Sequence, residues 1–412
     1  MAGWISVVAL FGLATAQPGP PPAEGYCIHC HKEQQERRLT VPTSSIARSV
    51  HAILEGTCMN CHGGDAREPT KRAHDPRLGF RGKPSVQDVP RVCGGCHADA
   101  AFIRRFSAKL PVDQSSLYRV SVHGQELEKG NLEVATCVSC HGFHDVRKVT
   151  DPDAPVFPTE VSRTCGGCHG KQGHPAMKHS KRNPFEDWKE SVHGKAILER
   201  GDLSAPTCND CHGDHGASPP GTSDIHLACG QCHSQESEKF MEGPHAEPFE
   251  RLGFAQCVEC HSNHLIEPAT EVLLSESELG VCRKCHKSGS PGAEAAAVMR
   301  KMLIEAKKRA QVARNKVRIA RTVGLSLPDS DLLEAELHTA LARMRVDVHG
   351  MKSTALDGEF SRVHELTLKM TRVADAATER LEVRRQGHIV FVAMVSVLVG
   401  LIVVRIRRLR EE

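Results

Sequence analysis

Apolar and polar positions follow different patterns in different parts of the chain. An apolar run from Trp4 to Ala14 lies at the N-terminus, and a longer uncharged run from Ile389 to Val404 lies near the C-terminus. Between residues 26 and 290 neither a strand period nor a sustained helical period is present, and loops rich in Gly, Pro and Ser separate short helical pieces such as Ser191 to Gly201. The pattern predicts a mainly α protein with extensive irregular loops.

The helical period becomes continuous after residue 291 and predicts a bundle of long helices over 291–386. One seam is spaced by four and three residues, as in a coiled coil, at Met299, Leu303, Ala306, Ala310, Ala313, Val317 and Ala320. Residues 325–331 break it and offer an N-cap to a second helix. A third is expected from about Ser353 to Gln386, with one face formed by Leu356, Phe360, Val363, Met370, Val373 and Ala377. The bundle could also join copies of the chain in a homo-oligomer.

The two terminal apolar runs predict export and membrane anchoring. The first ends in an Ala-Thr-Ala cleavage site, so residues 1–16 are predicted as a signal peptide, before a Pro-rich linker over 17–25. An uncleaved anchor is the alternative, although the run is short for a span. Residues 387–404 are predicted as a transmembrane helix, with a buried core helix as the alternative. Arginines flank both ends of this segment, so the signal peptide decides the orientation. It places the bulk of the chain on the periplasmic side of a bacterial cytoplasmic membrane, with 405–412 as a basic cytoplasmic tail.

All 18 cysteines belong to one motif, Cys-x-x-Cys-His, which occurs nine times. Two thiols at this spacing can bond the two vinyl groups of one haem, and the adjacent His then lies beneath the iron as the proximal ligand. Zinc sites and disulfides are the alternatives, but neither requires a His directly after the second Cys. Nine covalently attached copies of haem c are therefore predicted over residues 26–290. The cysteines are Cys27, Cys30, Cys58, Cys61, Cys93, Cys96, Cys137, Cys140, Cys165, Cys168, Cys208, Cys211, Cys229, Cys232, Cys257, Cys260, Cys282 and Cys285. The proximal ligands are His31, His62, His97, His141, His169, His212, His233, His261 and His286.

The motifs are organised as one single site followed by four pairs. A Ser-Val-His or Gly-Pro-His stretch precedes each pair, which places His51, His123, His193 and His245 before the sites. In three pairs the first site continues as Cys-x-x-Cys-His-x-x-His, which adds His144, His215 and His264. In the remaining pair Asp65 takes this position, and a carboxylate cannot serve there as a nitrogen ligand.

In these features the chain resembles the doubled-CxxCH multihaem cytochromes c of the bacterial periplasm and cell surface. The resemblance covers residues 26 to 287 and stops before the helical part. It implies that His51, His123 and His193, and more weakly His245, are sixth ligands of haem iron. It also implies that His144, His215 and His264 ligate neighbouring haems. Five further histidines are weaker candidates for the same role: His29, His74, His174, His179 and His226.

Charge excludes one class of partner and leaves another open. With 53 basic and 50 acidic side chains the formal net charge is +3, which gives no case for nucleic-acid binding. Residues 294–324 carry nine Lys or Arg against two Glu, which favours either a docking surface for acidic groups or an ordinary solvated helix face. His338, His349 and His364 lie in this helical part and are expected on polar faces.

The leading functional prediction is a membrane-anchored respiratory electron carrier that passes electrons between periplasmic or membrane redox proteins. One alternative is a multihaem oxidoreductase with an open-coordinate haem, acting on a small nitrogen or sulfur oxyanion. The pentahaem nitrite reductases have one site in which Lys replaces the proximal His, and no motif of this chain has that replacement. The only tyrosines, Tyr26 and Tyr118, lie far from the C-terminal helices, where hydroxylamine oxidoreductases carry their cross-linking Tyr. The other alternative is a quinol-interacting subunit of a larger respiratory complex.

Overall fold

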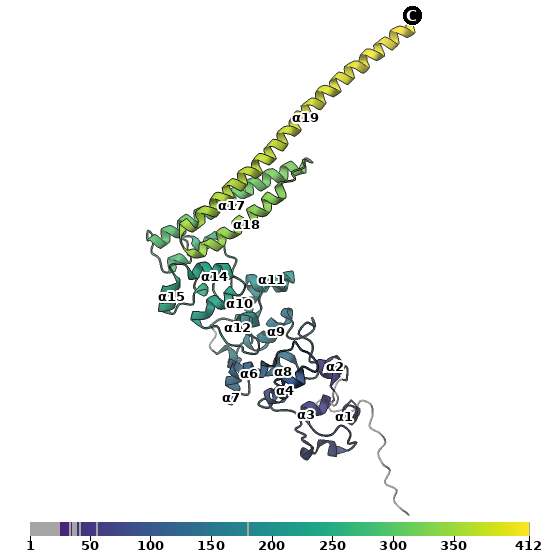
Figure 1. The fold of residues 1–412 in the computed structure, drawn as a ribbon, viewed down its shortest axis with the longest axis vertical. Helices are drawn as coiled ribbons and strands as arrows, with labels where there is room; N and C mark the ends of the chain where they lie inside the picture. Colours follow the sequence, from purple (N-terminus) through teal and green to yellow (C-terminus); the bar gives the residue numbers. More distant parts are fainter. Residues whose placement is uncertain are drawn as a thin grey trace, which may run out of the picture. The chain divides into compact units, whose positions relative to one another are not determined.

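The computed structural model describes residues 25–32, 34, 39–40, 43–54, 57–178 and 181–411. The predicted signal peptide and nearly all of the linker lie outside these residues. The described part is mainly helical and contains no strand, which confirms the predicted class (Figure 1). It falls into two compact units that divide between Pro219 and Pro220.

The first unit consists of short helices joined by irregular segments. Its α-helices are α1 (Gly25–His31), α2 (Thr43–Arg48), α3 (Thr57–His62), α4 (Val89–His97), α5 (Ala100–Ile103), α6 (Gln114–Val120), α7 (Val122–Glu128), α8 (Cys137–His141), α9 (Pro158–His169), α10 (Pro184–Glu190), α11 (Val192–Arg200) and α12 (Cys208–His212). Its 3₁₀ turns are η1 (Val50–Ile53), η2 (Lys71–His74), η3 (Pro76–Leu78) and η4 (Pro175–Met177). Few apolar side chains are buried here; Ile197 and Trp188 are among them. Protein side chains alone therefore make only a small core in this unit.

Each Cys-x-x-Cys-His motif of the first unit closes a helix. Helices α1, α3, α4, α8, α9 and α12 all end at the His of their motif. In α8 and α12 a threonine, Thr136 or Thr207, forms a capping box with the third residue of the helix. Because a capping box satisfies backbone N–H groups at both ends of the first turn, it fixes where these five-residue helices begin.

The second unit starts with further short elements and continues into long helices. The short ones are η5 (Thr222–Asp224), α13 (Ile225–Gly230), α14 (Ser234–Met241), α15 (Ala246–Leu252), α16 (Cys257–His261), η6 (Glu271–Leu274) and η7 (Cys282–Lys284). The long ones are α17 (Pro291–Thr322), α18 (Ser330–Asp347) and α19 (Asp357–Glu411), with the turns η8 (Val348–Gly350) and η9 (Ser353–Leu356) between the last two. Asp329 stands at the N-cap of α18 but its side chain makes no capping bond.

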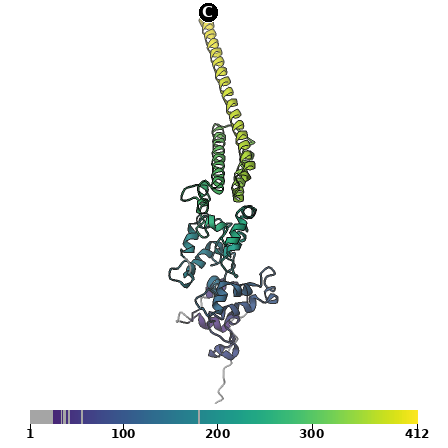
Figure 2. The ribbon, with the colours of Figure 1, turned by 90° about the vertical axis from the view of Figure 1, so that its left-hand side faces the viewer.

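The helical bundle follows the predicted seam closely. All seven seam residues of α17 are buried, from Met299 to Ala320. They pack against Leu337 and Met344 of α18 and Val363 and Met370 of α19, which are all fully buried. Helices α17 and α18 lie beside α19 along its first half (Figures 1 and 2). The alternation of four and three residues therefore identified the core of the bundle correctly.

The C-terminal half of α19 extends past the ends of α17 and α18 (Figures 1 and 2). Its apolar stretch has a mean hydropathy of 2.8 over 18 residues, and none of that stretch is buried within the protein. The alternative of a buried core helix is therefore wrong for this chain. The helix is long and apolar enough to cross a membrane.

Candidate metal centres

The first feature of the candidate site is a set of paired imidazoles. For seven of the Cys-x-x-Cys-His motifs in the described part of the chain, the His faces a second His with 5.9 to 6.2 Å between ring centres. The pairs are His31 with His74, His97 with His51, His62 with His144, His169 with His123, His141 with His215, His286 with His245, and His261 with His349. Six of these second histidines are predicted sixth ligands.

The separation of the rings fits two ligands on opposite sides of one metal ion. An imidazole nitrogen binds a first-row metal at about 2.0 Å, so two trans imidazoles have ring centres about 6 Å apart. A tetrahedral ion would bring them to about 5 Å. The two imidazoles of each pair would therefore fit a metal ion held between them better than a tetrahedral site, and the two thiols of the motif precede the first of these histidines in the sequence. Among the described residues no group of three or more His, Cys, Asp or Glu side chains is arranged to hold a bare metal ion.

A helix N-terminus positions the His of the Ser-Val-His stretch. The hydroxyl of Ser121 accepts a bond from the backbone N–H of Gly124 at 3.0 Å and donates to the carbonyl of Tyr118 at 2.6 Å. It therefore ends α6 and caps α7 at the same point, with His123 in the first turn of α7. A Cβ on Gly124 would lie 2.1 Å from the Tyr118 oxygen, so glycine is required for this close approach. Ser191 and Gly194 repeat the arrangement around His193.

The partners follow a regular pattern along the repeats. The His that precedes a pair of motifs faces the second site of the same pair, as His123 faces His169. The His at the end of Cys-x-x-Cys-His-x-x-His faces the first site of the preceding pair, as His144 faces His62 and His215 faces His141.

A repeated backbone bond holds this register. Val50 donates its N–H to the carbonyl of Val146 at 2.7 Å, and Val122 donates to Ala217 at 3.1 Å. In each case the donor is the Val of a Ser-Val-His stretch. The acceptor belongs to the next pair of motifs and lies two residues after the final His of its Cys-x-x-Cys-His-x-x-His sequence. Consecutive pairs of the first unit are therefore joined in the same way.

Backbone carbonyls orient several of the rings. The Nδ1 atom of His31 lies 2.7 Å from the carbonyl oxygen of Leu39, and that of His62 lies 2.7 Å from the carbonyl oxygen of Gly82. A carbonyl oxygen only accepts, so Nδ1 carries the proton and Nε2 keeps its lone pair for a metal. These bonds fix both the tautomer and the direction of the ring.

Burial keeps many of the paired imidazoles neutral. It lowers the pKa of His51, His123 and His144, and the facing imidazole lowers the pKa of His51 and His144 further. Burial and then the facing His286 lower the pKa of His245 in the same way. Since only a neutral imidazole has a lone pair for a metal, these environments favour the ligating form.

The thiols of consecutive motifs lie close together. None of the 18 cysteines, all of which lie in the described part of the chain, is in a disulfide bond. The first cysteines of two motifs form a hydrogen bond in four places: Cys58 with Cys27, Cys93 with Cys137, Cys165 with Cys208, and Cys229 with Cys257. In each pair the donor's pKa is raised by the bond and the acceptor's is lowered, as for Cys137, whose pKa falls to about 7.

The second cysteines approach the next motif in turn. Burial, followed by the neighbouring Cys165, raises the pKa of Cys140 to about 11. Burial and then Cys282 likewise raise the pKa of Cys260 to about 11, and burial and then Cys96 raise that of Cys61. Along the chain, a motif approaches the next one alternately through its first cysteine and through its second cysteine. Within each unit every motif therefore neighbours the next one in the sequence.

Other predicted ligands have different surroundings. His174 accepts a bond from the Ala176 N–H through Nδ1 at 3.1 Å, which leaves the ring proton on Nε2 and opposes ligation through that atom. His226 places Nδ1 3.0 Å from Oε1 of Gln256. Neither faces the imidazole of a motif among the described residues. His179 lies outside the described residues. His29, His193, His212, His233 and His264 all make interactions within the structure.

No partner for His349 was predicted from the sequence. It was expected on a polar face, as were His338 and His364, which are indeed exposed. The structure corrects this expectation for His349, which is half-buried with its ring centre 6.1 Å from that of His261. A signal was present, because Val348-His349-Gly350 repeats the Val-His-Gly of residues 122–124 and 192–194.

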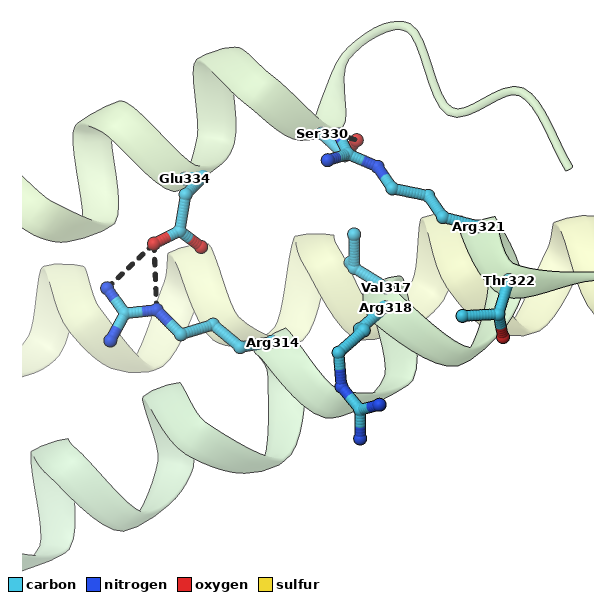
Figure 3. A pocket seen from close by; sticks show the side chains of 7 residues that line it. All are labelled: Arg314, Val317, Arg318, Arg321, Thr322, Ser330 and Glu334. Atoms are coloured by element: carbon cyan, nitrogen blue, oxygen red, sulfur yellow. Dashed lines mark hydrogen bonds and ion pairs between the residues drawn. The ribbon is translucent and has the colours of Figure 1, made fainter. Parts of the chain in front are cut away.

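Acidic side chains, most of them on neighbouring elements, pair with many of the basic residues of α17. Arg314 pairs with Glu334 of α18 at 2.7 Å, and Arg321 bonds Ser330 and Asp331 at 2.5 Å. Arg314, Arg321, Ser330 and Glu334 line a cleft between α17 and α18, in which Arg318 points away from Glu334 (Figure 3). Lys307, Arg309 and Lys316 also have acidic partners. The ion pairs favour a solvated helix face over a docking surface.

Comparisons with protein-family profiles, with curated proteins and with solved structures find no match to this chain.

Proposed function

We propose that the chain is a nine-haem c-type cytochrome that relays electrons between redox partners and is tethered by α19 to the periplasmic side of a bacterial membrane. Each haem supplies one reversible one-electron iron couple when bound, with a potential set by its axial ligands, burial and nearby charge. The residues of the chain would attach the haems through the motif cysteines and ligate them from both sides through paired histidines.

The observation that carries the proposal is the set of seven imidazole pairs. Two thiols, one proximal His and one facing His about 6 Å away are the complete protein donor set of a six-coordinate haem c. An iron with both axial positions filled has no open site for a substrate, which favours electron transfer over substrate turnover.

The closeness of consecutive motifs supports a relay. Within each unit the cysteines of one motif lie beside those of the next, as Cys229 does with Cys257 and Cys260 with Cys282. Cofactors attached to these thiols would stand in the same order as the motifs. Electrons could then pass from each cofactor to its neighbour within a unit.

The apolar half of α19 supports the tether. Its side chains are exposed along the whole stretch from Ile389 to Val404, and lipid is the environment that such a surface fits. The predicted signal peptide is the basis for placing the cysteine-rich part on the periplasmic side.

The test is low-temperature EPR of the oxidised, detergent-solubilised protein, with haem quantified on the same sample. Nine haems per chain and nine low-spin irons are expected. The double variant Cys257→Ser/Cys260→Ser should contain eight haems, and this matched control links the count to the motifs.

Two results would contradict the proposal. Fewer than nine haems in the unaltered protein would contradict the motif assignment. A stoichiometric high-spin signal that changes on addition of nitrite or hydroxylamine would instead identify an oxidoreductase with an open haem.

A further inference from the structure

His349 stands outside the cysteine-rich part of the sequence but inside the same pairing geometry. It lies in η8, between α18 and α19, and its ring centre is 6.1 Å from that of His261 with an angle of 30° between the rings. The six other pairs span 5.9 to 6.2 Å. Distance therefore does not separate this pair from the rest.

The ring of His349 is held in the tautomer that a metal ligand needs. Its Nδ1 atom lies 3.1 Å from the carbonyl oxygens of both Arg345 and Val346, in the last turn of α18. Carbonyl oxygens only accept hydrogen bonds. Nδ1 is therefore protonated and Nε2 keeps the lone pair, as in His31 and His62.

The surrounding fold fixes η8 in place. Met344 and Leu356, on either side of the turn, are fully buried in the bundle core. Helix α14 packs against η8, and a Cβ on Gly243 at the end of α14 would lie 3.3 Å from the carbonyl oxygen of His349. The bundle thus holds the chain on both sides of His349, at Met344 before it and at Leu356 after it.

The pairing pattern of the repeats shows why the partner of His261 comes from outside the cysteine-rich part of the chain. His62 and His141 are the proximal ligands of first sites, and each faces a His supplied by the next pair of motifs. His261 is the proximal His of the first site in the last pair, and no cysteine follows Cys285. There is no further pair to supply its partner.

We propose that His349 is the sixth ligand of the haem attached through Cys257 and Cys260. This rests on the proposed function, since it requires a haem at that motif. The helical bundle then completes the haem array in addition to carrying the anchor, because one axial ligand folds with α18 and α19.

The test compares His349→Ala with His338→Ala in the full-length protein. His338 is an exposed His on α18 and serves as the matched control. In His349→Ala all nine haems should remain, because the thioethers are intact, while one ninth of the low-spin EPR intensity converts to a high-spin signal. The low-spin signal that is lost should be a rhombic one, because the ring planes of His261 and His349 are only 30° apart. His338→Ala should match the unaltered protein.

Two further measurements separate ligation from a structural role. Added imidazole should restore the lost low-spin signal of His349→Ala, because it can occupy a vacant axial position. His349→Met should keep the iron low-spin and raise the reduction potential of one haem in nine, since Met/His ligation raises the potential of c-type haems.

An unchanged low-spin count in His349→Ala, with all haems present, would overturn the assignment. Loss of several low-spin irons, or loss that imidazole does not restore, would also overturn it and show a structural role. Mass spectrometry of the peptide containing Cys257 and Cys260 tests the underlying premise: if it carries no haem, the proposed function fails at this motif and the assignment fails with it.

Discussion

Ser262 occupies a backbone conformation that glycine holds in the other repeats. It follows the proximal His of the first site in the last pair, with φ 66° and ψ −178°. Gly142 and Gly213 stand at the same place in their pairs, with φ 75° and ψ −169° and with φ 79° and ψ 160°. This region is essentially restricted to glycine, because a Cβ clashes with the neighbouring peptide groups. The variant Ser262→Gly should therefore stabilise the second unit.

The size of the effect follows from two opposing contributions. Relief of the backbone strain contributes about 1 to 3 kcal/mol. The larger conformational entropy of glycine in the unfolded chain costs about 0.5 to 1 kcal/mol. The net gain in the free energy of unfolding should be about 1 kcal/mol, which corresponds to a rise in Tm of about 2 to 4 °C for a unit of this size.

Thermal unfolding followed by far-ultraviolet circular dichroism measures this change. The reciprocal variant Gly213→Ser provides the control, because it introduces the same strain into the first unit and should lower stability. A Ser262→Gly variant that unfolds at a lower temperature than the unaltered protein, or a Gly213→Ser variant without loss, would refute the reasoning from backbone conformation.

Three other variants test the packing, the site and the anchor. Leu337→Ala removes a fully buried side chain from the bundle and should lower the free energy of unfolding, measured by chemical denaturation, by about 2 to 5 kcal/mol. Its control is Leu332→Ala, at a side chain that is 64% exposed, which should change that free energy by less than about 0.5 kcal/mol. Gly124→Ala places a Cβ 2.1 Å from the Tyr118 oxygen, so it should displace His123 and convert one iron to high spin in EPR, whereas Gly358→Ala has open space around it and should not. Val397→Arg places a charge in the apolar run at a cost of about 2.5 to 3.5 kcal/mol; it should reduce the fraction of protein that sediments with membranes, and Val383→Arg, outside the run, should not.

The helical bundle was predictable from the sequence because its core obeys a single period. The seam from Met299 to Ala320 is buried at every predicted position, since residues spaced by four and three share one face of a helix. The cysteine-rich part offered no comparable rule. Its chain path depends on turns and caps such as those at Ser121 and Gly124, and its side chains make few apolar contacts that would leave a period.

The partners of the motif histidines were predictable only in part. The resemblance proposed His51, His123 and His144 as sixth ligands, and the structure places each about 6 Å from the His of a motif, which leaves the ligand role itself a prediction. It could not say which proximal His each one faces, because that depends on how one pair of motifs stacks on the next. His349 was missed because residues after 291 were treated as a separate helical region, although its Val-His-Gly tripeptide repeats those of the cysteine-rich part.

The pairing register implies that the array needs a cap at each end. A first site draws its facing His from the next pair, so a register of identical repeats would leave both ends incomplete. At the beginning Asp65 stands where the facing His would be, and His74 of η2 lies opposite His31 instead. At the end η8 brings His349 opposite His261. In repeat proteins the terminal units are generally atypical because they cover an otherwise open face, and here the same need is met by two imidazoles from outside the repeated motif. A C-terminal cap built into the bundle that leads to the apolar half of α19 would couple the last part of the array to the anchor.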